Sequence, residues 1–290
     1  MLEYSLLLLY TLVGWGNGIL QKLWQRKTEK IKYSSTVYLI AQTACSCVIF
    51  FFMAGFDIRA NAVTLIYSFI YALIVILALV SNFVAMSKMN LMLCSVFNNG
   101  SQTVVWLTGI IFFRDAFEFG GALSAGLILI SVLLPLLKPS AGKSAGGWIA
   151  VGFLRTAVAA SSTILIKLYA AEPQKMSDSV MCFYTNLFIM VLLLGYFLFL
   201  PDKSGLIADF GRVGGKIVYA PLCAAASNIS TVLSMYVLRT MPLSTYSIIT
   251  YSLGFATVFI NSKFIFRENL TAIDVAAFAL SAVAIVITIL

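Results

Sequence analysis

The chain has 290 residues, of which 61% are hydrophobic and 10% charged, and its formal net charge is +8. Soluble domains carry about 25% charged residues, so this composition excludes an ordinary water-soluble fold. The absence of histidine excludes a histidine proton relay or metal site. The five cysteines all lie inside apolar runs, which favours packing roles over disulfides or zinc binding. We expect no metal site and no cofactor.

Apolar runs of about 20 residues, the length that crosses a bilayer, follow one another along the whole chain. The first run continues past the length of a signal peptide, so we expect it to be a span. Only the stretch 201–214 leaves room for more than a short loop. We therefore predict an all-α integral membrane protein with ten transmembrane helices. Their predicted ranges are 3–22, 34–55, 62–85, 91–112, 118–137, 147–169, 179–200, 215–237, 243–264 and 271–290.

The basic residues are unequally divided between the two sides of the predicted bundle. Thirteen of the 19 Lys and Arg residues lie in the connections that follow odd-numbered spans, and four lie in the other connections. Cytoplasmic loops carry the excess of Lys and Arg in membrane proteins. The distribution therefore predicts that both termini lie outside the cytoplasm and that the basic run 22–32 lies inside it.

Two sequence matches indicate an internal repeat. The first span ends Asn17-Gly-Ile-Leu-Gln-Lys22, and the sixth ends Ser162-Thr-Ile-Leu-Ile-Lys167. The fourth span ends in Phe-Phe-Arg114-Asp115, and the ninth in Ile-Phe-Arg267-Glu268. We predict two related halves, 1–137 and 147–290, joined by a linker at 138–146. Because five spans is an odd number, the second half is inverted, as in secondary transporters.

Three features together suggest a family: the two five-span halves, the polar first span Gly14-Trp-Gly-Asn-Gly18, and the acid that closes spans 4 and 9. In these features the chain resembles the drug/metabolite transporter superfamily in its ten-span, EamA-like form. That family usually has Gly-Glu where this chain has Arg-Asp and Arg-Glu. Its members are typically described with both termini in the cytoplasm, whereas the charges here predict the opposite. We keep the prediction from charge.

Polar side chains recur at steps of three and four in spans 1, 3, 4, 6, 8 and 9, so they share helix faces. Polar groups are costly in lipid and face a cavity or the bundle interior. A single Ser or Thr more often serves helix–helix contact. We predict a central cavity lined by these six spans, with spans 2, 5, 7 and 10 as a lipid-facing or dimer-facing shell. The predicted substrate-binding residues are Asn17, Gln21, Tyr71, Asn99, Gln102, Trp106, Arg155, Ser162, Lys167, Asn228 and Tyr251.

Arg155 indicates the substrate class. It lies about eight residues into span 6, roughly 12 Å deep, where it needs an anion, carbonyl groups or water. All 11 acidic residues lie in loops or near span ends, which disfavours proton-coupled transport of cationic drugs. A guanidinium binds carboxylate or phosphate through two N–H groups. Lys167 could assist, or it could extend to the membrane interface. An amino-acid-like, anionic or zwitterionic metabolite fits best.

We therefore expect a secondary active transporter of a small organic metabolite that works by alternating access. The alternatives are a flippase or translocator for a lipid-linked or phosphorylated substrate and, less favoured, an intramembrane enzyme. The chain lacks a paired acid, a histidine or a Ser/Lys dyad, so we expect no enzyme. The expected partners are a small-molecule substrate and membrane lipids, without nucleic acid. A coupling ion or proton, and a monomeric or homodimeric state, stay open. The expected location is a bacterial plasma (inner) membrane.

Overall fold

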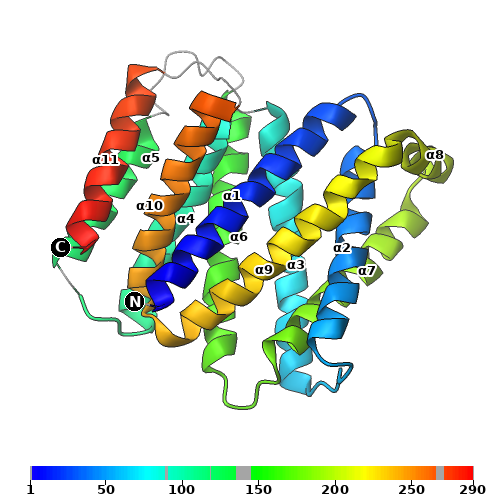
Figure 1. Ribbon diagram of the computed structural model, residues 1–290, viewed down its shortest axis with the longest axis horizontal. Helices are drawn as coiled ribbons and strands as arrows, with labels where there is room; N and C mark the ends of the chain where they lie inside the picture. Colours follow the sequence, from blue (N-terminus) through cyan, green and yellow to red (C-terminus); the bar gives the residue numbers. More distant parts are fainter. Residues whose placement is uncertain (1, 89–90, 118, 135–144, 266–270, 290) are drawn as a thin grey trace. The chain divides into compact units, whose positions relative to one another are not determined.

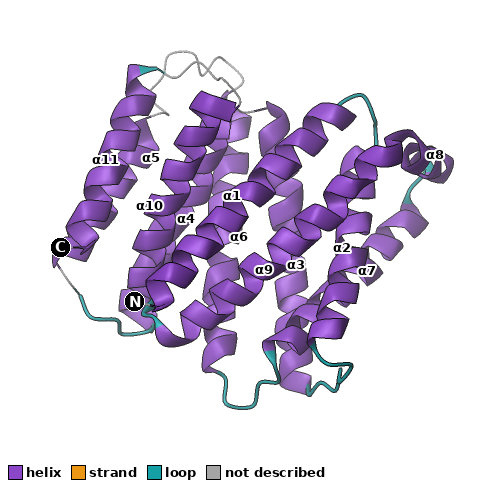
Figure 2. Ribbon diagram, in the orientation of Figure 1, coloured by secondary structure: helices purple, strands orange, loops and turns teal. Residues whose placement is uncertain are grey.

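The computed structural model describes residues 2–88, 91–117, 119–134, 145–265 and 271–289. Every regular element within these ranges is helical (Figure 2). The elements are α1 (Leu2–Thr28), α2 (Ser34–Met53), α3 (Ala62–Lys88), α4 (Leu91–Phe112), α5 (Phe119–Leu133), α6 (Ala145–Ala171), α7 (Asp178–Phe199), α8 (Lys203–Val213), η2 (Gly214–Val218), α9 (Tyr219–Thr240), α10 (Leu243–Ile260), η3 (Asn261–Ile265) and α11 (Ala272–Ile289).

Each of the ten ranges predicted to span the membrane is largely helical. The bounds of α4 equal its predicted range, whereas α1 continues to Thr28 instead of ending at 22. The added turns contain Gln, Lys, Leu and Arg, which are good helix formers, so the helix outlasts its apolar run. The longer connection after α7 contains the short helix α8.

Five described helical stretches are long and apolar enough to cross a membrane by length and composition. They lie in α2, α3, α6, α7 and the continuous stretch from α8 through α9, and shorter apolar stretches lie in α4, α5 and α11. Large apolar side chains are widely exposed: Phe112, Phe119 and Phe199 are 77%, 79% and 89% exposed. Lipid tails accommodate such side chains, whereas water does not. The protein is a membrane-embedded helical protein, as predicted.

The described chain forms two compact units. Unit 1 comprises Met1–Leu12, Leu77–Ala170 and Tyr236–Leu290, and unit 2 comprises Val13–Ile76 and Ala171–Met235. Each unit combines helices from both halves of the sequence.

In unit 1, α4 packs on α10 and α5 packs on α11 (Figure 1). Their shared core contains Trp106, Ile128, Ile248 and Tyr251. The Ser124 hydroxyl of α5 donates to the Ala284 carbonyl of α11 at 3.0 Å, which holds these two helices together. The outer faces of the same pair are apolar and exposed, as expected of a shell that faces lipid or a second copy.

In unit 2, α2 packs on α7 (Figure 1). Contacts between hydroxyl groups and backbone carbonyls join α3 to α7. The Ser68 hydroxyl donates to the Met181 carbonyl at 3.1 Å, and the Thr185 hydroxyl lies 3.4 Å from the Ser68 carbonyl. Small hydroxyl-bearing residues allow close helix contact in membranes, which explains their place at this interface.

The short helix α8 packs on α2 through residues spaced three and four apart. Leu206, Asp209 and Val213 are buried, so one face of α8 is covered. The Asp209 carboxylate accepts a hydrogen bond from the Tyr33 backbone N–H at 3.0 Å, directly before the first residue of α2. A carboxylate at this position favours the helix because the first N–H groups of a helix lack internal partners.

Asp202 caps the start of α8 and also joins this helix to the α1–α2 connection. Its carboxylate accepts from the Gly205 N–H at 2.9 Å and from the Lys32 ammonium at 3.1 Å. These two donors, Lys32 first, hold the pKa of Asp202 below its ordinary value of 3.8. Hydrogen bonds with Tyr33 and then Asp202 raise the pKa of Lys32 above 10.5.

The sign of each shift defines a pH window. The pKa of Asp202 is depressed, so its contribution to the stability of the docked α8 is present above pH 3.8. This contribution is lost as the pH falls through the lower pKa of the folded state. The pKa of Lys32 is raised, so its contribution to the stability of the docked α8 is present below pH 10.5. This contribution is lost as the pH rises through the higher pKa of the folded state. The docking of α8 should therefore be constant from about pH 5 to about pH 9.

Asp202→Ala should increase amide exchange across α8 throughout that window, because it removes both the cap and the ion pair. Hydrogen–deuterium exchange with mass spectrometry measures this. Asp202→Asn, which keeps a capping oxygen, should have a smaller effect. The control is Asp57→Ala, which also removes an exposed carboxylate from an ion pair, in this case the pair with the nearby Arg59 at 3.6 Å. Unchanged exchange in Asp202→Ala would contradict the docking role.

Candidate functional site

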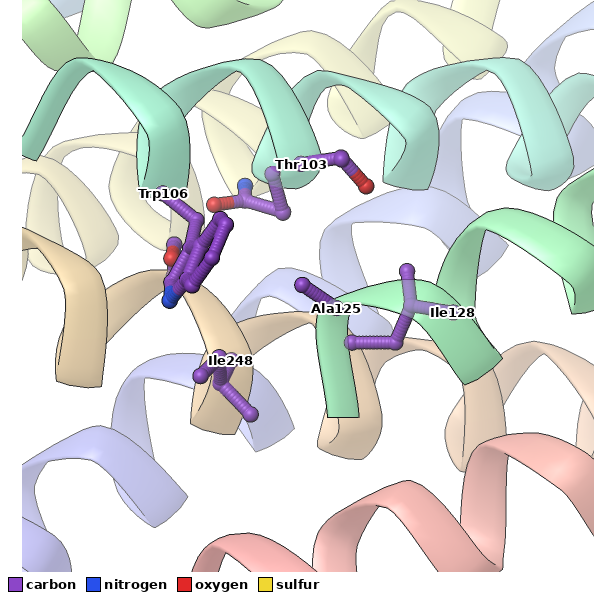
Figure 3. Close-up of a pocket in the computed structure, with 7 residues that line it drawn as sticks. Thr103, Trp106, Ala125, Ile128 and Ile248 are labelled. Carbon is purple, nitrogen blue, oxygen red and sulfur yellow. The ribbon is translucent and has the colours of Figure 1, made fainter. Parts of the chain in front are cut away.

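In unit 1, the polar face of α4 meets α5 and α10. Gln102 and Trp106 lie one helical turn apart on this face, as predicted from their spacing. Figure 3 shows the Trp106 indole projecting from α4 toward Ile248 of α10, with Ala125 and Ile128 of α5 nearby. The space among these side chains is too narrow to admit a water molecule. In this structure the face is therefore closed.

Two polar atoms on this face lack hydrogen bonds within the part of the chain that the structure describes. They are Oε1 of Gln102 and Oγ1 of Thr103, and both atoms are buried. Buried polar groups usually have a partner, so each such atom calls for water, a ligand or a different arrangement of the helices. The α4 face therefore has unused hydrogen-bonding capacity.

Trp106 also lines a larger cavity of about 90 Å³. It extends from Gly121 of α5 to Ser244 and Thr245 in the first turn of α10. The Trp106 indole nitrogen is close to Gly121, where an added Cβ would lie 3.5 Å from it. This volume can hold several water molecules or one small polar group. Trp106 and Ile248 therefore line both spaces.

The turn between α9 and α10 is held from both sides by charged groups of unit 1. Asp115, which follows α4, accepts from the Ser244 backbone N–H at 2.8 Å. The Lys167 ammonium of α6 donates to the carbonyls of Leu238 at 2.7 Å and Met241 at 3.0 Å. An anion thus meets the start of α10 and a cation meets the end of α9, which is the favourable placement for both helix dipoles. We call these groups the turn clamp: Asp115 and Lys167.

Lys167 therefore has backbone partners here. Its role in a substrate site stays a prediction. Its ammonium contacts two backbone carbonyls in this structure, and these are not the contacts of a side chain that extends to the membrane interface. Tyr251, also predicted for the site, is fully buried in the unit 1 core. Its hydroxyl lies 2.5 Å from the Ser131 hydroxyl of α5. This contact joins α5 to α10, which is the helix–helix role that hydroxyls often have.

The two other predicted residues of α6 differ in their surroundings. The Ser162 hydroxyl donates to the Ala159 carbonyl of its own helix at 2.8 Å. Arg155 is partly buried, and its Nη1 atom is fully covered. Because α6 begins at Ala145, Arg155 lies roughly 15 Å along the helix. A guanidinium at that depth stays charged, so its surroundings must stabilise a cation.

In unit 2, two adjacent residues of α9 connect to α1 and α2. The Asn17 amide of α1 lies 3.4 Å from the Ser227 hydroxyl, and the Ser46 hydroxyl of α2 donates to the Asn228 Oδ1 at 3.1 Å. Three buried polar atoms here have no hydrogen bond within the described residues. They are Asn17 Oδ1, Asn228 Nδ2 and Oε1 of Gln42, which lies one turn before Ser46 on α2. Predicted residues Asn17 and Asn228 thus share one polar cluster.

Three predicted site residues remain, Gln21 and Tyr71 in unit 2 and Asn99 in unit 1. Gln21 of α1 is buried and approaches Tyr38 of α2. Tyr71 is partly buried on α3. Asn99 lies on α4 in unit 1, and its side chain falls outside what the structure describes.

Sequence reasoning missed Ser227 and the capping role of Asp115. Asp115 was visible as part of a repeated motif, but the motif does not reveal that its partner is the N–H of Ser244, 129 residues away. Ser227 precedes Asn228 directly, and a search for paired polar residues along each span would have found it.

No known protein-family profile matches this sequence, and no curated protein matches it. Solved structures do resemble it. One, described only as the crystal structure of a protein, aligns with a TM-score of 0.59 at 14% identity, covering 97% of this chain and 98% of that chain. At this identity the likeness speaks for the fold alone. The chain therefore shares a fold, over nearly its whole length, with a protein of known structure.

Proposed function

We propose that this protein is a secondary active transporter that moves a small organic metabolite by alternating access between two inverted five-helix repeats. One observation carries the proposal: helices at equivalent positions of the two halves pack on each other. The second helices of each half, α2 and α7, are in contact, as are the fourth, α4 and α10, and the fifth, α5 and α11. Such like-with-like pairing is expected when two similar halves associate about a two-fold axis.

The polar groups support transport because they lie on membrane-embedded helices and keep unused hydrogen-bonding capacity. The α4 face of unit 1 and the Asn17–Ser227–Asn228 cluster of unit 2 both have buried atoms without a described partner. A packed scaffold would satisfy these atoms, whereas a site that binds substrate in one conformation leaves them for the ligand.

The substrate class follows from charge. No acidic residue lies in the middle of a predicted span, and Arg155 lies well inside α6. A cation at that depth favours a substrate with a carboxylate or phosphate. We propose an amino-acid-like metabolite, anionic or zwitterionic.

The test begins with thermal stability of the purified protein in one detergent. Amino acids, dicarboxylates, sugar phosphates and quaternary ammonium compounds are added in turn, because a ligand stabilises the state it binds. We expect an amino acid or organic acid to raise the melting temperature and to accumulate inside proteoliposomes. Stabilisation by quaternary ammonium compounds alone would refute the substrate class. Movement of fluorescent lipids across the vesicle membrane without solute uptake would favour the flippase alternative.

Arg155→Lys tests the guanidinium directly. The charge stays but the two-pronged hydrogen bonding is lost, so affinity for the stabilising compound should fall about tenfold or more, with the melting temperature of the free protein unchanged. Isothermal titration and thermal melting measure the two effects. The matched control is Arg239→Lys, at an exposed position near the end of α9. If Arg155→Lys instead lowers the melting temperature and leaves affinity intact, the residue is structural.

A further inference from the structure

In unit 2, the connection between α1 and α2 and the segment from α8 to η2 form one strongly basic surface. Residues 26–33 and 202–218 contain seven basic and three acidic side chains. We propose that this surface binds the head groups of anionic phospholipids and holds α8 at the membrane interface. We call it the basic surface, and its members are Arg26, Lys27, Lys30, Lys32, Lys203, Arg212 and Lys216.

Contacts between distant parts of the sequence assemble this surface. The Lys27 ammonium donates to the Tyr219 hydroxyl at 2.5 Å and lies 4.9 Å from the centre of its ring. The Lys216 ammonium donates to the Lys27 carbonyl at 2.9 Å. The ion pair between Lys32 and Asp202, described above, makes a third link. Because the segments are tied together, their cations act as one surface.

Two of the three acidic side chains, Asp202 and Asp209, are already engaged, and only Glu29 is exposed among the seven cations. Asp209 is 1% exposed and is bound by the Tyr33 N–H and by Arg212 at 3.0 Å. Asp202 is shared among Lys32, Tyr33 and the start of α8. By contrast, the side chains of Lys32 and Arg212 are 68% and 69% exposed. Arg212 uses one nitrogen for Asp209, and the rest of its guanidinium can donate to a phosphate.

Apolar side chains beside the cations identify the occupant as a lipid surface. Leu206 and Val213 of α8 are buried, whereas Ile207 on another face is 64% exposed. Val218 of η2 is 52% exposed, and Phe199 at the end of α7 is 89% exposed. Cations next to exposed apolar groups on a short amphipathic helix are typical of helices that lie in the membrane interface. A free inorganic anion would satisfy the charges but leave the apolar groups in water.

This inference does not depend on the transport proposal, since it concerns a surface and a ligand that transport assays do not measure. The experiment compares lipid retention by native mass spectrometry. Purified protein in detergent is mixed with phosphatidylglycerol or phosphatidylcholine, and bound lipids are counted. We expect wild-type protein to bind phosphatidylglycerol preferentially and to lose this preference in high salt.

The double variant Lys30→Gln with Lys203→Gln removes two exposed charges and leaves the contacts described above, which tie the segments together, in place. Each basic residue near an anionic membrane contributes about fivefold in affinity, so we expect roughly tenfold weaker binding of phosphatidylglycerol after screening. The control is Arg59→Gln with Lys175→Gln. Arg59 follows the end of α2 that is remote from the basic surface, because the 20 residues of α2 span about 30 Å.

Three outcomes would overturn the proposal. Equal retention of phosphatidylglycerol by the double variant and wild type would show that the basic surface does not bind it. An equal loss in the control would show a net-charge effect only. Displacement of phosphatidylglycerol by millimolar inorganic phosphate would show a site for free anions instead of lipid. Circular dichroism and thermal melting confirm that the double variant is folded, so a loss of binding is interpretable.

Discussion

Gly109→Ala should destabilise the protein by about 1–3 kcal/mol. A Cβ at this position would lie 2.7 Å from Asp115 Oδ2 and 3.0 Å from the Ser244 nitrogen. Those two atoms are hydrogen-bonded to each other at 2.8 Å. The methyl group therefore fits only if the carboxylate leaves the start of α10 or if α10 moves away from α4. Thermal melting in a single detergent measures the loss.

Gly126→Ala is the matched control, because it makes the same change on α5 of the same unit. Nothing lies within 4 Å of an added Cβ at Gly126. Alanine favours a helix over glycine by up to about 1 kcal/mol, so this variant should be as stable as wild type or more stable. Equal destabilisation by both variants would show that the contact at Gly109 is not the cause.

Lys167→Met should also lower the melting temperature, by an amount equivalent to about 1–3 kcal/mol. Methionine keeps the length and the apolar stem but cannot donate to the carbonyls of Leu238 and Met241. Both of these residues are buried, at 0% and 3% exposure, so their carbonyls have limited access to water. The end of α9 would lose its cation as well as two hydrogen bonds. Chemical or thermal unfolding of the purified protein measures the effect.

The control for charge is Lys263→Met in η3, where the side chain is exposed. A double-variant cycle with Asp115→Ala tests whether the turn clamp acts as one device. Since both residues hold the same turn, the two losses should be less than additive. A Lys167→Met protein with wild-type stability but reduced ligand affinity would instead return Lys167 to the substrate site.

Local composition is enough to locate the helices. Each predicted apolar range contains a helix because, in lipid, a helix satisfies its backbone N–H and C=O groups without outside partners. This is a local requirement, so local composition is enough to predict it. The helical step likewise placed Gln102 and Trp106 on one face of α4, since faces depend only on spacing along one helix.

The partners of each polar face, by contrast, are visible only in the folded protein. Lys167 and its carbonyl partners are 71 and 74 residues apart, and Asn17 and Ser227 are 210 residues apart. A lysine near a span end is equally compatible with lipid head groups, a substrate and backbone carbonyls, and periodicity cannot separate these. The contact of Tyr251 with Ser131 of α5 was likewise not visible from spacing, and its predicted role in a substrate site stays a prediction. The partner of a buried polar group depends on which helices pack together, and that choice arises from contacts between side chains far apart in the chain.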